Sequence, residues 1–215
     1  MFPTARPRVY DLRVAPRLGL TPAEEDTLRA RLSALAPLSP KTWKALLSLG
    51  ERRALPKGSL FTRPGEPATH FAVLLSGLLR HYYVDARGKE SVKAFRVPME
   101  VSAPYAELIQ RKPSRTHIEA LADSELLIFR YDDFEAAAEG SIELQRLARR
   151  FGEVHFVQKE QREYEFLMLS AEERYRQFCA RLPELLQHIP QHQVASYIGV
   201  TPVALSRIRA RSRRK

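Results

Sequence analysis

The stretch from residue 191 to residue 211, QHQVASYIGVTPVALSRIRAR, restricts the fold of this chain more than any other. Read as two short helices around a tight turn, it places five apolar residues inward: Val194, Ile198, Val200, Leu205 and Ile208. Ala195 is small where the second helix must cross closely, and Gly199 falls in the turn, where a positive φ costs glycine little. The agreement in register predicts a helix-turn-helix.

The start of the second helix carries its own signals. Thr201 is a natural N-cap, and Pro202 suits the first helical position because its missing N–H would have no partner there. The exposed side would present five residues near the end where a recognition helix meets base edges, namely Thr201, Pro202, Val203, Ser206 and Arg207. We therefore predict that these residues bind double-stranded DNA.

Charge supports the same interpretation. The net charge is +10, and six cations follow position 200 with no acid among them, namely Arg207, Arg209, Arg211, Arg213, Arg214 and Lys215. A pI near 10 implies an acidic partner, and nucleic acid is favoured over a membrane because no basic amphipathic stretch precedes an anchor. On charge alone, a solvated basic tail on an ordinary helical hairpin is an equal alternative.

Composition excludes several classes of protein. The 215 residues, 44% hydrophobic and 28% charged, are typical of a soluble globular chain with one large or two small domains. The single Cys179 leaves no internal disulfide and no four-cysteine cluster. Without an 18-residue apolar run or a secretory signal, we expect a cytoplasmic protein that does not enter a membrane.

Catalytic and metal-binding patterns are also missing from the sequence. Its six histidines form neither HxH nor HExxH spacing, and no glycine-rich phosphate loop or nucleophile elbow is found. We expect neither an enzyme nor a metal site nor a cofactor.

The rest of the chain changes its hydrophobic period twice. After an arm at residues 1–20, a helix capped by Thr21 carries Leu28, Leu32 and Leu35, and a second helix carrying Trp43 ends at Gly50. From Ala54 to about residue 130 the period is near two, with a bend at Ser76-Gly77 and a hairpin turn at residues 85–88. This pattern predicts an antiparallel barrel or sandwich.

A long helix is expected to follow. Ser141 can cap a helix that runs to about Met168 with one apolar stripe. The stripe packs either against its own domain or against a second copy. We predict a homodimer because a single helix-turn-helix reads few base pairs, and the predicted contacts are Leu144, Leu147, Phe151 and Val154.

This order of elements resembles the catabolite-activator/FNR (Crp/Fnr) superfamily of transcription regulators. The motifs that carry the resemblance are Pro64-Gly65-Glu66, Ser76 to Arg80, Asp85 to Glu90, Ile118 to Leu121, Glu172 to Tyr175, Pro183 to Leu186 and the segment 189–209. It implies an α+β chain with an N-terminal arm (1–20), a cyclic-nucleotide-binding-like antiparallel β-roll sensor domain (21–140), a dimerisation helix (141–168) and a helix-turn-helix domain (169–215). It also implies a homodimer on a near-palindromic site.

The effector site departs from that family. Cyclic-nucleotide binders of this fold carry a Gly-Glu pair, with Arg-Ser or Arg-Thr ten residues after the glutamate. Arg115-Thr116 matches the second half, but Pro104-Tyr105 replaces the first, and Glu107 is two residues out of register. We expect a pocket of Tyr105, Glu107, Arg115 and Thr116 that takes a small anionic effector, or none, rather than cyclic AMP.

The recognition helix departs as well. Well-known members have a glutamate at the position of Val203, which can offer only an apolar contact, whereas Arg207 matches an arginine that can grip guanine. His188 to Gln191 leaves little room for a wing hairpin, so backbone contacts fall to His192, Gln193, Arg209 and Arg211. The alternative function is a signalling or interaction protein on this fold that binds DNA only non-specifically.

Overall fold

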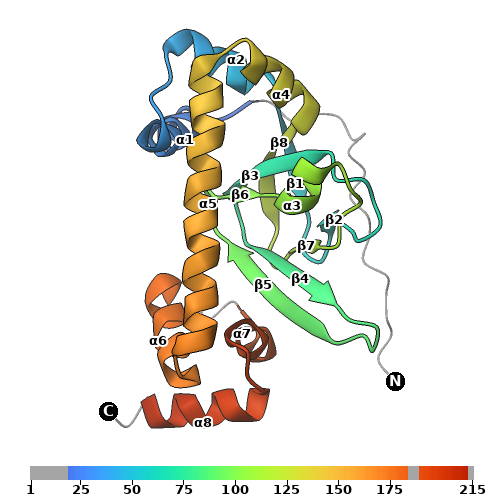
Figure 1. Ribbon diagram of the computed structural model, residues 1–215, viewed down its shortest axis with the longest axis vertical. Coiled ribbons are helices and arrows are strands. Elements are labelled where there is room, and N and C mark those ends of the chain that lie inside the picture. Colours follow the sequence, from blue (N-terminus) through green and yellow to red (C-terminus); the bar gives the residue numbers. More distant parts are fainter. Residues whose placement is uncertain (1–18, 184–188, 213–215) are drawn as a thin grey trace. The chain divides into compact units, whose positions relative to one another are not determined.

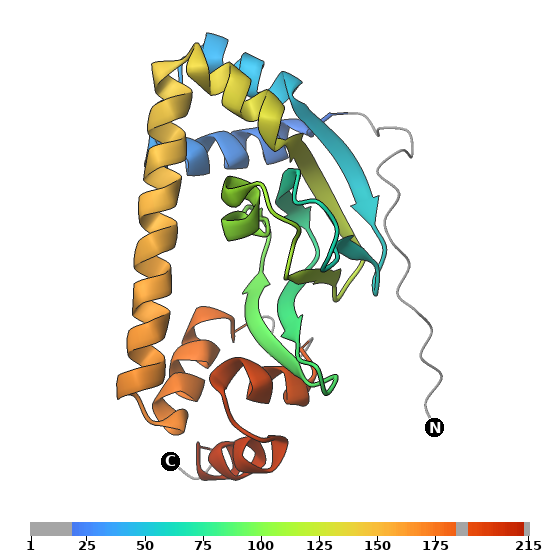
Figure 2. The ribbon, with the colours of Figure 1, turned by 45° about the vertical axis from the view of Figure 1, so that its right-hand side comes forward.

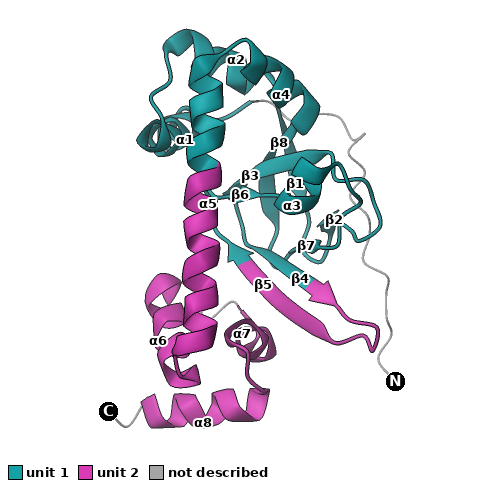
Figure 3. Cartoon of the chain, in the orientation of Figure 1, with its two compact units in different colours: residues 1–82, 95–151 teal, residues 83–94, 152–215 magenta. Residues whose placement is uncertain are grey.

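The computed structural model describes residues 19–183 and 189–212 (Figure 1). The predicted arm at 1–20 lies almost wholly outside them, as do residues 184–186 of one motif and the basic residues 213–215. Chain contacts divide the molecule into two compact units (Figure 3). Unit 1 takes the residues up to Tyr82 and Phe95–Phe151, and unit 2 takes Tyr83–Ala94 and the residues from Gly152 onward.

Two four-stranded sheets form the β-roll (Figure 1). One has the order β1 (Gly50–Leu55), β8 (Ser124–Arg130), β3 (His70–Ser76) and β6 (Val101–Ser102). The other has the order β2 (Leu60–Thr62), β7 (His117–Ala120), β4 (Leu79–Val84) and β5 (Glu90–Arg96). β8 pairs antiparallel with β1 and β3, and β7 pairs antiparallel with β2 and β4. The predicted α+β fold with an antiparallel β-roll is confirmed.

Strands β3 and β8 are buried on both faces. Ala72 and Leu74 of β3 join Leu126 and Ile128 of β8 in the core between the sheets. The alternate residues, among them Val73 and Phe129, join a second core that also contains Trp43. Because successive side chains of a strand point to opposite faces, two cores require the unbroken apolar runs FAVLL and LLIF.

Helices cover one of these cores. They are α1 (Pro22–Leu35), α2 (Pro40–Ser48), α4 (Tyr131–Glu139) and the first part of α5 (Ile142–Met168). The predicted extent of α5 is confirmed. Strand β1 begins at Gly50 rather than Ala54, because residues 50–53 pair with residues 126–129 of β8. Helix α3 (Tyr105–Gln110) was not predicted. Within the described ranges, no helix is both long and apolar enough to cross a membrane.

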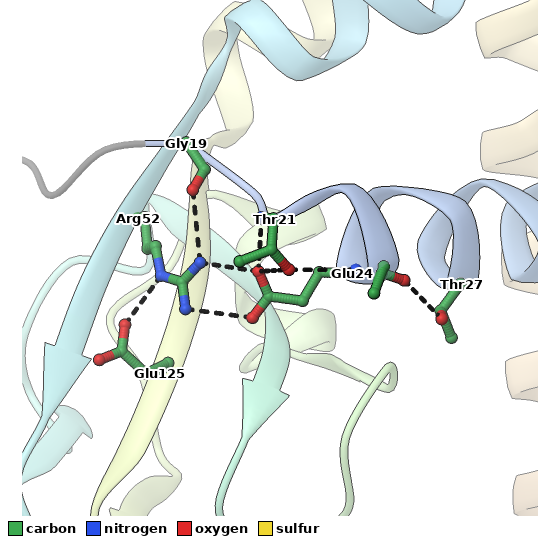
Figure 4. Close-up of polar contacts among 7 residues, drawn as sticks. Gly19, Thr21, Glu24, Thr27, Arg52 and Glu125 are labelled. Atoms are coloured by element: carbon green, nitrogen blue, oxygen red, sulfur yellow. Dashed lines mark hydrogen bonds and ion pairs between the residues drawn. The ribbon is translucent and has the colours of Figure 1, made fainter.

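Polar contacts join the start of α1 to the sheet (Figure 4). Thr21 and Glu24 form a capping box, in which the Thr21 N–H donates to Glu24 Oε2 at 2.8 Å. Arg52 of β1 donates to both oxygens of Glu24, at 2.7 and 3.1 Å, and to Glu125 of β8 at 2.9 Å. Burial opposes ionisation of Glu24, but the Thr21 and Arg52 bonds outweigh it and lower the pKa of the carboxyl below 4.5.

The lowered pKa of Glu24 predicts an acid-dependent loss of stability. Its contribution is complete above the unfolded value near 4.5 and disappears as pH falls through the lower folded pKa. Glu24→Gln should reduce the free energy of unfolding at pH 7 by up to about 1 kcal/mol, because it removes the charge that binds Arg52, whereas a Gln amide can still serve in the capping box. It should also flatten the decline of stability below pH 4.5, measured by urea denaturation. Asp26→Asn, on the exposed side of α1, is the control; the same change in both variants would contradict the assignment.

Candidate nucleic-acid interface

The predicted helix-turn-helix lies in unit 2 as α7 (Gln191–Ile198) and α8 (Pro202–Ser212), next to α6 (Ala171–Arg181) in sequence. Four of the five residues predicted to face inward are buried, namely Val194, Ile198, Leu205 and Ile208. Val200 is half-buried, and the Ala195 side chain is fully buried. The register deduced from the sequence is therefore present in the structure.

The turn between the helices closes α7 with two backbone bonds. Gly199 N–H donates to Ser196 O at 3.2 Å and Val200 N–H donates to Ala195 O at 2.9 Å, which is the Schellman pattern. Gly199 has φ +76°, and a Cβ there would lie 2.6 Å from Cε1 of Phe166 on α5. Glycine is thus required twice at this position, by the backbone and by the aromatic ring above it.

Arginines from α5 and α6 bind the same end of α7. Arg162 donates to Tyr197 O at 2.8 Å, and its guanidinium carbon lies 3.9 Å from the centre of the Tyr197 ring. Arg174 donates to Ile198 O at 2.9 Å. Cations at a helix C-terminus are stabilising, because the last carbonyls are otherwise unpaired and carry partial negative charge.

Nothing in the sequence marks these two arginines for this role. Their residue type and spacing resemble those of arginines on a solvated helix face, so only the fold shows that they point at α7. Burial lowers the pKa of Arg162, the direction expected for a cation removed from water. The two arginines position the helix-turn-helix and are committed to contacts within unit 2.

The exposed side of α8 carries the residues predicted to read DNA. Thr201 is exposed at the N-cap and accepts from Ala204 N–H at 3.2 Å, as expected. Pro202, Val203, Ser206, Arg207 and Arg211 are exposed too, and the Val203 side chain is 63% accessible. Residues 203, 206, 207 and 210 are three or four apart, so they occupy one face of the helix.

One of the predicted backbone contacts needs correction. His192 is exposed at the start of α7, but Gln193 is 7% accessible, and its Oε1 has no hydrogen-bond partner among the described residues. Gln193 lies four residues before the buried Tyr197 and next to the buried Val194, so it belongs to the inward face of α7. Arg209 is half-buried, and its contact with the DNA backbone stays a prediction.

Strand β5 of the β4–β5 hairpin contacts α7. Val92 N–H donates to Ser196 Oγ at 2.9 Å, and Ser196 Oγ donates to Glu90 O at 3.3 Å. The predicted turn at residues 85–88 is present, with Asp85 Oδ1 accepting from two backbone N–H groups. The sequence does not reveal the contact of Ser196, because a serine on a short helix gives no sign of a strand partner 104 residues away.

Two of the four residues predicted to form an effector pocket, Glu107 and Arg115, are in direct contact. Glu107 is 2% accessible and its Oε1 accepts from Arg115 Nε at 2.6 Å, so the glutamate reaches the arginine despite its shifted register. Glu107 belongs to helix α3, which begins at Tyr105, so its position differs from the one that the family pattern gives the glutamate. Thr116 is fully buried, whereas Tyr105 lines an apolar cavity whose described lining includes none of the other three residues.

The four residues predicted to form the dimer contact differ in how exposed they are. Leu144 and Leu147 are buried in the core of unit 1, which corrects their assignment, because α2 and the sheet already cover that face of α5. Phe151 is half-buried and packs edge-on against Tyr105, with ring centres 5.5 Å apart. Val154, in contrast, is 41% accessible.

The chain is similar to a known domain family and to several solved structures. Residues 52–141 match the family model described as cyclic nucleotide-binding domain. FixK2 from Bradyrhizobium japonicum is similar with a TM-score of 0.65 and 20% identity, over 75% of this chain and 83% of that one. The catabolite activator protein of Thermus thermophilus is similar with a TM-score of 0.54 and 23% identity, over 81% and 83% of the chains. The chain has the Crp/Fnr fold.

A third solved structure extends the comparison. The c-di-GMP responsive global regulator CLP of Xanthomonas campestris shares the Crp/Fnr fold with a TM-score of 0.64 and 14% identity, over 81% of this chain and 92% of that one. No curated protein sequence matches the chain. The resemblance deduced from the sequence motifs is therefore confirmed for the fold.

Gly199→Ala tests the turn. The left-handed backbone costs a residue with a Cβ about 1–2 kcal/mol, and the approach of Phe166 adds to that cost. Gly88→Ala is the matched control, because Gly88 has φ +79° and a Cβ added there would meet nothing within 4 Å. Gly199→Ala should lower the free energy of unfolding of unit 2 more than Gly88→Ala does, as measured by chemical denaturation. Equal losses would show that Phe166 imposes no constraint.

Proposed function

We propose that this protein is a homodimeric, sequence-specific transcription regulator of the Crp/Fnr type. The observation that carries the proposal is the exposed face of α8, which presents Val203, Ser206 and Arg207 to solvent while the opposite face of the helix is buried. The support behind that helix consists of the Gly199 turn, Arg162 and Arg174. A recognition helix needs exposed side chains that can reach the bases and a fixed position within its domain.

The exposed residues fit separate roles at DNA. Arg207 can donate two hydrogen bonds to O6 and N7 of guanine, and Val203 can contact only an apolar group such as the thymine methyl. His192 at the start of α7 and Arg211 at the end of α8 suit the phosphate backbone, which fixes position without reading sequence. Gln193, being buried, is not part of the proposed interface.

The exposed side of α5 in unit 2 supports the dimer. Phe156, Val157, Tyr164, Leu167 and Met168 are between 53% and 75% accessible. Val157 lies seven residues before Tyr164, and Leu167 and Met168 lie three and four after it, so these residues form one apolar stripe with Phe156 at its edge, which a second copy of the same helix can cover. We propose this stripe, together with Val154, as the dimer contact in place of Leu144 and Leu147.

Cyclic AMP is not the effector that we propose. Tyr105 stands at the glutamate position of the family pattern, and Glu107 already neutralises Arg115. An anion bound by Arg115, whose side chain is 73% accessible, would have to compete with that ion pair. Cytoplasmic location is part of the same proposal, since the DNA target lies there.

Selection of randomised duplex DNA on the purified protein at about 150 mM salt tests the function, because non-specific phosphate binding is weakened at that ionic strength. We expect enrichment of a two-fold symmetric site. Recovery of unenriched DNA with only salt-sensitive binding would favour the alternative, an interaction protein that binds DNA non-specifically.

Arg207→Ala and Arg211→Ala separate base reading from phosphate binding. On the selected site, Arg207→Ala should cost about 1–3 kcal/mol and relax the preference at one base position. Arg211→Ala should weaken all sites alike and reduce the dependence of affinity on salt. Fluorescence anisotropy on the site and on single-base variants measures both effects. Identical, sequence-independent losses would remove Arg207 from base reading.

The double variant Val157→Glu/Tyr164→Glu tests the dimer. Two carboxylates in the apolar stripe would have to be buried unpaired, so the variant should sediment as a monomer and lose affinity for a symmetric site. Gln158→Glu adds one carboxylate outside the stripe, at an exposed position, and should remain dimeric. A sedimenting mass unchanged by the double substitution would place the dimer contact elsewhere.

A further inference from the structure

Unit 1 contains an apolar cavity of about 120 Å³. Its walls come from α1, α2, α3, α4, the sheet that contains β3 and β8, and the first part of α5. Six aromatic rings line it, those of Phe71, Tyr105, Phe129, Tyr131, Phe134 and Phe151. None of the described lining residues carries a charge.

The aromatic rings are held in defined pairs. Phe71 stacks on Phe129 with ring centres 5.0 Å apart, and Phe134 meets Phe71 edge-on at 5.5 Å. Tyr105 meets Phe151 edge-on at 5.5 Å. Rings in such arrangements present both faces and edges, so a further ring placed among them finds favourable stacked and edge-on contacts.

Two tyrosines give the lining its polar side-chain groups. Burial raises the pKa of Tyr105, and burial together with a hydrogen bond to Glu135 raises the pKa of Tyr131 to about 12. Both phenols therefore stay neutral near pH 7. A phenolic O–H can donate to or accept from one hydroxyl of a ligand, whereas a ligand ion would enter this lining without a countercharge.

We propose that this cavity binds a small neutral aromatic molecule with one ring and at most one hydroxyl group, such as phenol. The volume is of the same order as that of an apolar protein cavity of about 150 Å³ that takes up benzene. The ligand class differs from the anion expected at Glu107 and Arg115, and the site is separate from that ion pair. The proposal does not depend on DNA binding.

Calorimetric titration of the full chain with phenol, benzene and cyclic AMP tests the proposal. Phenol and benzene should bind with dissociation constants of about 1 mM or below, and cyclic AMP should not compete with them. Ala148→Leu places three extra carbons at the cavity wall on α5 and should weaken both aromatic ligands at least tenfold. Ala136→Leu, at an exposed position of α4 outside the lining, should bind them as the unchanged protein does.

A second variant protects the test against misfolding. Tyr105→Phe/Tyr131→Phe keeps the ring volume and removes the hydroxyls, so it should reduce the affinity for phenol relative to benzene. Thermal melting of each variant checks that the fold is retained. Absence of phenol binding by the unchanged protein at 10 mM, roughly ten times the highest expected dissociation constant, would overturn the proposal. Unchanged phenol binding by a folded Ala148→Leu variant would overturn it too.

Discussion

Burial of β3 and β8 on both faces is the constraint on which unit 1 depends. A strand with one apolar face needs one covering layer, but residues 72–75 and 126–129 supply apolar side chains to two. The second sheet covers one side, and helices α1, α2, α4 and the start of α5 cover the other. The helices are therefore required parts of the unit, and the Glu24–Arg52–Glu125 contacts fix the first of them to the sheet. The aromatic cavity lies in this covered layer.

In unit 2, the location of each arginine decides what its charge can do. Arg162 and Arg174 bind the carbonyls at the end of α7, whereas Arg207 and Arg211 are exposed on α8. Figure 2 shows α7 and α8 as the red helices near the C-terminal end of the chain. The first pair holds the helix-turn-helix, and the second pair is available to a polyanion. A count of net charge treats them alike, although only the exposed arginines can replace the counterions of DNA. This division favours a specific interface over a diffuse basic surface.

The two candidate effector sites differ in chemistry. Glu107 and Arg115 form an ion pair, so an anion bound there has to compete with a carboxylate already in contact with the arginine. The aromatic cavity instead has unfilled volume and two neutral hydroxyls. One helix connects the cavity wall to unit 2, since α5 runs without a break from Ile142 to Met168.

The sequence by itself determined the elements with strong local rules. Thr21, Gly199, Thr201-Pro202 and the bounds of α5 could be read directly, because capping, positive φ and helical period act between residues close in the chain. The tertiary structure alone decided which apolar residues of α5 stay exposed, why Gln193 is buried, and that Tyr105 faces a cavity while Glu107 faces Arg115. Those outcomes depend on contacts between residues far apart in sequence, and a local sequence pattern does not show which distant residues pack against it.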